Sequence, residues 1–139
     1  SVYFLGAKMD VLQAALKAVK KNYPQLIIAG AQDGYFGQEL LVAKAIQKVK
    51  PDIVLVALGF PKQELFIQKY YQSSQAIWMG VGGSFDVLAG KVKRAPFFWQ
   101  KHHIEWLYRL IQEPTRLPRM IALPKYLLFV LAKKFHLIK

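Results

Sequence analysis

The sequence predicts an α/β fold, namely a Rossmann-like, doubly wound and mostly parallel sheet followed by a helical, basic C-terminal appendage. Short and almost uniformly apolar runs alternate with amphipathic stretches over residues 1–96. Apolar strands of this kind are typical of a parallel sheet that helices cover on both faces. The composition changes after Pro96, and residues 97–139 are therefore predicted to form the separate appendage.

The elements of the first part follow one another with short connections. The predicted strands are residues 2–5, 25–30, 52–58 and 75–82. Between them, residues 10–23, 38–50 and 62–71 have apolar side chains at the three- and four-residue spacing of a helix. The fourth strand leads into a glycine-rich stretch, VGGSFDVLAGKVKRAP, at residues 81–96. Four β-α units of this kind predict the doubly wound arrangement.

The appendage is predicted to contain two helices. Residues 102–114 have an amphipathic pattern, and residues 117–139 contain two prolines followed by a stretch that is apolar nearly all round, with lysines at its ends. That apolar run is shorter than the roughly 20 residues that cross a bilayer. An interfacial helix, or a helix packed against a neighbour, is therefore expected.

Composition and charge narrow the function classes. The chain has 139 residues, a net charge of +12 and no cysteine, which excludes disulfides, thiolate metal sites and a cysteine nucleophile. Residues 1–89 hold nine Lys/Arg against six Asp/Glu, whereas residues 90–139 hold eleven against two. This asymmetry predicts an anionic partner: nucleic acid, acidic lipid or a phosphorylated substrate. The start of the chain has no signal-peptide pattern and no initial Met, and the sequence is interpreted as part of a longer protein.

Ligands of open α/β sheets bind beyond the carboxyl ends of the strands, and the candidate residues are taken from those loops. Tyr35 offers a ring for stacking, although packing at the rim is an equal alternative. Gln63 and Glu64 lie on the first turn of a helix, where Glu64 could merely complement the helix dipole. Turn formation is an alternative role for the glycines of these loops.

The glycine-rich loop after the fourth strand supplies the other candidates. Gly82 and Gly83 would let the backbone approach a ligand closely, and Asp86 could accept a hydrogen bond from a ribose, a sugar or a uracil N–H. The alternative for Asp86 is a helix N-cap.

Missing motifs argue against several kinds of site. The sequence has no Walker or Gly-x-Gly-x-x-Gly fingerprint. It also has no Asp-x-Asp pair, and His102-His103 beside Glu105 lacks the usual metal-ligand spacing. A diphosphate bound without metal needs protein cations, for which the guanidinium fork is well suited. The candidates are the arginines of the basic third: Arg94, Arg109, Arg116 and Arg119.

Five stretches together resemble the WecG/TagA/CpsF glycosyltransferases over nearly the whole chain. They are FLGAK, AGAQDGYF, GFPKQE, GVGGSFDVLAGKVKRAP and EWLYRLIQEPTRLPR, in this order. The resemblance implies an inverting, metal-independent enzyme that transfers N-acetylmannosamine or a related sugar from a UDP-sugar. The implied acceptor is undecaprenyl-diphosphate-linked N-acetylglucosamine, for teichoic acid, common antigen or capsule synthesis. It also implies peripheral attachment to the cytoplasmic face of the bacterial plasma membrane, and leaves homo-oligomer formation open.

The resemblance also implies roles for particular residues. Tyr35, Gln63 and Asp86 match the nucleotide-sugar pocket of the family. Arg109, Arg116 and Arg119 match an appendage that closes over the site and touches the diphosphate and the membrane. Family members are longer at the N-terminus, and that part holds the expected general base, so the catalytic residue of this chain is unknown.

Two alternative functions follow from these observations. A non-catalytic fragment or remnant that binds a UDP-sugar or a lipid is one, because the expected general base is absent. A nucleic-acid-binding module is the other, motivated by the charge of +12. It is disfavoured because the cations of the last third alternate with Leu, Ile and Phe rather than with a stacking platform.

Overall fold

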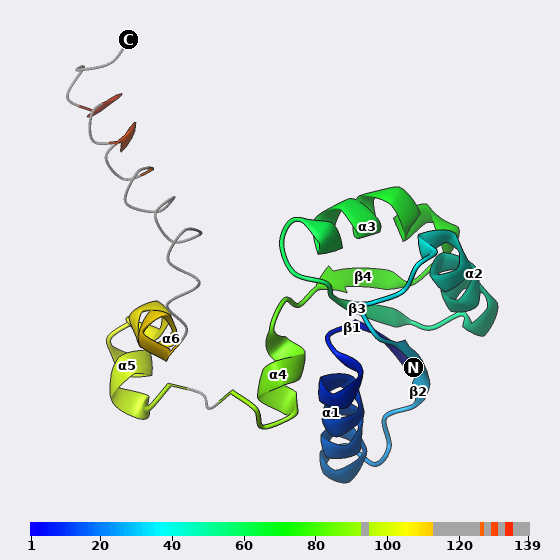
Figure 1. Ribbon diagram of the computed structural model, residues 1–139, viewed down its shortest axis with the longest axis horizontal. Coiled ribbons are helices and arrows are strands. Elements are labelled where there is room, and N and C mark those ends of the chain that lie inside the picture. The colour runs from blue at the N-terminus through cyan, green and yellow to red at the C-terminus, as the bar shows by residue number, and fades with distance from the viewer. Residues whose placement is uncertain (93–94, 113–125, 127–128, 131–132, 135–139) are drawn as a thin grey trace. The chain divides into compact units, whose positions relative to one another are not determined.

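The computed structural model describes residues 1–92, 95–112, 126, 129–130 and 133–134 (Figure 1). It divides into two compact units, Ser1–Lys93 and Arg94–Lys139. The first unit contains four strands, β1 (Val2–Gly6), β2 (Ile28–Gln32), β3 (Ile53–Ala57) and β4 (Ile77–Gly80). They form one parallel sheet in the order β2-β1-β3-β4. The predicted parallel α/β arrangement is therefore confirmed.

Helices cover both faces of the sheet because successive strand residues point to opposite sides. On one face, Val2 and Phe4 of β1 pack with α1 (Met9–Asn22) and α4 (Ser84–Leu88). On the other face, Tyr3 and Leu5 pack with α2 (Glu39–Val49) and α3 (Lys62–Tyr70), which is followed by the 3-10 helix η1 (Tyr71–Ser73). Figure 1 shows α1 and α4 side by side, on the side of the sheet away from α3.

The strand order creates a switch point at the centre of the sheet. From β1 the chain crosses to β2 at one edge, and it then returns past β1 to form β3 on the other side. The helices α1 and α3 pack on opposite faces of the sheet. The connections after β1 and β3 therefore leave the sheet in opposite directions. A crevice between such connections is the usual ligand site of an open α/β sheet.

Two strands, β2 and β4, differ from the prediction by two residues or more at each end, whereas β1 and β3 differ by at most one residue at an end. β2 begins at Ile28 rather than at residue 25, because a turn at Pro24 bonds the Leu26 N–H to the Tyr23 carbonyl oxygen at 3.0 Å. β4 is confined to Ile77–Gly80 rather than 75–82. It cannot extend through Gly82, whose φ of +51° turns the chain towards α4.

The second unit begins with two short helices, α5 (Phe97–Lys101) and α6 (Glu105–Gln112). The prediction of one helix over residues 102–114 is therefore wrong at its start. Pro96 is the N-cap of α5, and the left-handed φ of +58° at His103 interrupts the helix between α5 and α6. The rings of Trp99 and Tyr108, with centroids 5.5 Å apart, pack the two helices together.

The predicted helix over residues 117–139 lies outside the described residues except at Tyr126, Phe129, Val130, Lys133 and Lys134. In the part of the chain that the structure describes, no helix is both long and apolar enough to span a membrane.

Candidate functional site

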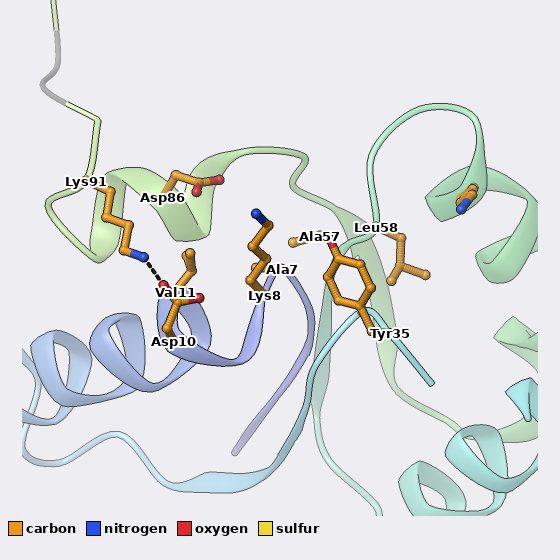
Figure 2. A pocket seen from close by; sticks show the side chains of 11 residues that line it. Ala7, Lys8, Asp10, Val11, Tyr35, Ala57, Leu58, Asp86 and Lys91 are labelled. Carbon is orange, nitrogen blue, oxygen red and sulfur yellow. Dashed lines mark hydrogen bonds and ion pairs between the residues drawn. The ribbon is translucent and has the colours of Figure 1, made fainter. Parts of the chain in front are cut away.

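Residues of the segments after β1, β2 and β3, and residues of α4 and the segment behind it, line one cavity of about 520 Å³ (Figure 2). The cavity lies at the carboxyl ends of the strands, at the switch point between β1 and β3. Its lining comes from four separate connections: Ala7, Lys8, Asp10 and Val11; Gly34 and Tyr35; Ala57, Leu58 and Lys62; and Asp86 and Lys91. The strand ends thus assemble a single candidate site from residues that are far apart in the sequence.

Close backbone contacts fix the floor of this cavity. Gly6 has a φ of +121°, and a Cβ atom at this position would lie only 2.3 Å from the carbonyl oxygen of Ala57. The Ala7 N–H donates to that same oxygen at 2.9 Å, and the Ala7 carbonyl oxygen accepts from the Gly34 N–H at 2.8 Å. The loop after β1 is therefore bonded to the last residue of β3 and to the loop after β2. Ala7 itself has a left-handed φ of +61°, a strained backbone conformation often found at functional sites.

Two of the predicted site residues, Tyr35 and Asp86, line the cavity. The Tyr35 side chain is 74% exposed, and its backbone N–H donates to Asp33 Oδ1 at 2.9 Å, which fixes the turn that presents the ring. Asp86 lies within α4, whose N-cap is Gly83, so the alternative N-cap role of Asp86 is wrong. The neighbouring Phe85 is fully buried, with its ring centroid 5.4 Å from that of Phe4, and this contact anchors α4 beneath Asp86.

Gln63 and Glu64 do not line the cavity but determine the path of the loop that leads to it. Gln63 is buried, and its Oε1 accepts a hydrogen bond from the Gly82 N–H at 3.0 Å. Its Nε2 donates to Glu64 Oε1 at 2.8 Å. A Cβ atom at Gly80 would lie 2.8 Å from Gln63 Nε2, so the Gln63 side chain packs directly against the backbone of Gly80. The contacts of Gln63 therefore connect α3 to the glycine-rich loop, in which Gly82 and Gly83 form the turn before Asp86.

Four charged residues of the cavity were not among the candidates: Lys8, Asp10, Lys62 and Lys91. Lys91 forms an ion pair with Asp10, and its ammonium group lowers the pKa of the Asp10 carboxyl below the usual value of 3.8. The strand-end rule that selected Tyr35 and Asp86 would also have selected Lys8, which directly follows the loop after β1. No sequence pattern signals the pairing of Asp10 with Lys91.

The arginine candidates stay predictions. Arg109 lies in α6, whereas Arg94, Arg116 and Arg119 lie outside the described residues. No group of three or more His, Asp or Glu side chains that could hold a metal ion occurs within the described part of the chain.

The fold defines the first unit as a Rossmann-like α/β domain with a cavity at its strand ends, and the second unit contains the helices α5 and α6. Residues 1–139 match the glycosyl transferase WecG/TagA/CpsF family, and the chain belongs to this family. The family resemblance noted from the five sequence stretches is therefore confirmed.

Two relatives carry the name N-acetylglucosaminyldiphosphoundecaprenol N-acetyl-beta-D-mannosaminyltransferase. The protein from Bacillus spizizenii (strain ATCC 23059 / NRRL B-14472 / W23) is 47% identical over 131 residues, which cover 94% of this chain and 51% of that protein. The protein from Bacillus subtilis (strain 168) is 46% identical over 134 residues, which cover 96% of this chain and 52% of that protein. The chain thus spans about half the length of the curated relatives it matches.

Proposed function

We propose that this chain is the nucleotide-sugar-binding part of a glycosyltransferase that transfers N-acetylmannosamine, or a related sugar, from a UDP-sugar. The proposed acceptor is N-acetylglucosamine linked through diphosphate to undecaprenol, as in the names of the two relatives. The observation that supports this most strongly is that residues from all four β-α units line one cavity in a member of this family.

The lining of the cavity suits a nucleotide-sugar. The exposed Tyr35 ring offers a face on which a uracil can stack, an interaction worth about 1–3 kcal/mol per base. The Asp86 carboxylate can only accept hydrogen bonds while it is ionised, and ribose hydroxyls and the uracil N–H are donors. The Gln63–Gly82 hydrogen bond keeps the loop that presents Asp86 in place.

The proposed reaction is a direct displacement with inversion. The acceptor hydroxyl attacks the anomeric carbon of the donor, its proton passes to a general base, and UDP leaves with the electron pair of the broken bond. No residue of this chain is assigned as that base. We propose that protein cations, rather than a metal ion, neutralise the departing diphosphate.

Calorimetry with UDP and several UDP-sugars, with and without EDTA, tests the donor site. We expect binding that EDTA leaves unchanged and that Asp86→Asn weakens, since the amide replaces one acceptor oxygen by a donor. Asp52→Asn is the matched control, because Asp52 lies before β3 and away from the cavity. Absence of binding to UDP and to every UDP-sugar tried would refute the proposal.

The alternative is a chain that binds the donor or a lipid without turnover, and it is motivated by the half-length match to the relatives. Transfer of sugar from a UDP-sugar to a lipid-diphosphate acceptor by this chain alone would eliminate it. Donor binding that occurs without any transfer would favour it.

We also propose that the second unit attaches the protein peripherally to the cytoplasmic face of the plasma membrane. Its helices α5 and α6 expose Phe97, Phe98, Trp106 and Ile111, and the sequence around them is basic. Each cation near an anionic leaflet contributes about 1 kcal/mol of attraction.

Sedimentation with anionic vesicles tests this attachment. It should weaken in a Phe97→Ser, Phe98→Ser double variant. It should stay unchanged in Tyr71→Ser, because Tyr71 is an exposed aromatic residue of the first unit. Equal sedimentation of both variants would contradict membrane attachment through these helices.

A further inference from the structure

The cavity contains an excess of positive charge that the roles of Tyr35 and Asp86 leave unexplained. Three lysines and two acids line it, which is a net charge of +1, and the ion pair among these five residues joins Lys91 to Asp10. The other ion pairs among the described residues, Ser1–Asp52 and Lys69–Glu39, lie elsewhere. Lys8 and Lys62 therefore remain without an acidic partner in the part of the chain that the structure describes.

Lys8 and Lys62 occupy equivalent places on the two sides of the switch point. Lys8 is the N-cap of α1, after β1, and Lys62 is the first residue of α3, after β3. The hydrogen bonds of Ala7 to Ala57 and Gly34 fix the backbone immediately before Lys8. In Figure 2 the Lys8 amine extends into the cavity between Asp86 and Tyr35. Both lysines also lie where the positive ends of two helix dipoles add to their charge.

We propose that Lys8 and Lys62 bind the diphosphate of the nucleotide-sugar, so that the first unit neutralises this group by itself, without the appendage arginines. This inference rests on the proposed function. A neutral sugar or a base offers no negative charge to the two ammonium groups, whereas a diphosphate supplies charge to two separate cations. The same contacts would stabilise the negative charge that develops on the diphosphate as UDP leaves.

Lys91 is not part of this diphosphate site, because Asp10 already neutralises it. The ammonium groups of Lys8 and Lys62 form no such ion pair among the described residues. Each is a point charge on a flexible four-carbon stem and can adapt to either phosphate. The prediction is therefore specific to two of the three lysines in the lining.

Calorimetry of the full chain with UDP, UMP and uridine separates the diphosphate from the nucleoside. We expect the unmodified chain to bind UDP more tightly than UMP. Lys8→Gln and Lys62→Gln should each weaken UDP binding by roughly tenfold, or about 1.4 kcal/mol, while uridine binding changes little. Lys17→Gln is the matched control, because Lys17 is an exposed residue of α1 outside the cavity lining. Thermal unfolding of each variant verifies that the fold is retained.

The outcomes distinguish this inference from the proposed function. If the unmodified chain binds neither UDP nor a UDP-sugar, the proposed function fails and the lysine assignment with it. If it binds UDP but the two lysine variants keep the same ratio of UDP to UMP affinity, only the lysine assignment is overturned. Equal weakening of UDP and uridine in these variants would likewise overturn it, because a purely structural role affects the whole nucleotide.

Discussion

Replacing Gly6 by alanine should destabilise the first unit strongly, because Gly6 forms the closest contact at the floor of the cavity. The added Cβ atom would lie 2.3 Å from the carbonyl oxygen of Ala57 and 2.4 Å from its carbonyl carbon. A φ of +121° is itself unfavourable for alanine, at a cost of roughly 1–3 kcal/mol. Relieving the overlap moves the β3 backbone and breaks the hydrogen bond from the Ala7 N–H, which adds about 1–3 kcal/mol. The two contributions together predict a loss of about 2–6 kcal/mol in the free energy of unfolding.

Urea unfolding followed by tryptophan fluorescence measures this loss. Gly90→Ala is the matched control, since Gly90 also has a positive φ, of +70°, but a Cβ atom there would meet nothing within 4 Å. The control should lose only the backbone cost, about 1–2 kcal/mol. If the two variants lost the same free energy of unfolding, the close contact between residue 6 and Ala57 would contribute nothing to the loss, and the reasoning would be refuted.

Three further substitutions test other contacts. Gln63→Met keeps the side-chain length but removes the acceptor for the Gly82 N–H; it should cost about 1–3 kcal/mol and speed hydrogen exchange at Gly82, and unchanged exchange would contradict the positioning role. Lys91→Gln should raise the pKa of the Asp10 carboxyl towards 3.8. The ion pair stabilises the fold above that pH and is lost as the pH falls through the lowered pKa; an NMR titration in which the pKa of Asp10 stayed the same would refute the pairing. Phe85→Ala should cost about 3–5 kcal/mol on urea unfolding, and a loss under 1 kcal/mol would show that α4 is anchored elsewhere.

The sequence was most informative where apolar periodicity and topology coincide. Four apolar runs with amphipathic stretches between them admit few arrangements other than a parallel sheet with helices on both faces. The limits of β2 depended on a turn at Pro24, which an apolar run cannot reveal. The helix α5 was missed because Phe97–Lys101 lacks an amphipathic repeat, and its end depends on the backbone conformation at His103.

The candidate site was predicted in part. Tyr35 and Asp86 were found because the strand-end rule needs only the positions at which the strands end. Gln63 was chosen by the same rule, but its side chain turns to the Gly82 N–H, a contact between residues of two different loops. Lys8 and Lys62 were not predicted because nothing in the sequence distinguishes them from the other exposed lysines. Which lysines stay unpaired depends on three-dimensional contacts such as that between Lys91 and Asp10.

An NMR titration of the ¹⁵N-labelled chain with UDP tests most directly whether the cavity at the switch point is the nucleotide-sugar site. We expect the largest shift changes at backbone amides around the cavity, namely those of Lys8, Gly34, Tyr35, Leu58 and Asp86. The amides of Gln47, Lys50 and Ser73, which line a cavity elsewhere on the first unit, should not shift. Shifts confined to that second group, or the absence of any shift at saturating UDP, would contradict the assignment.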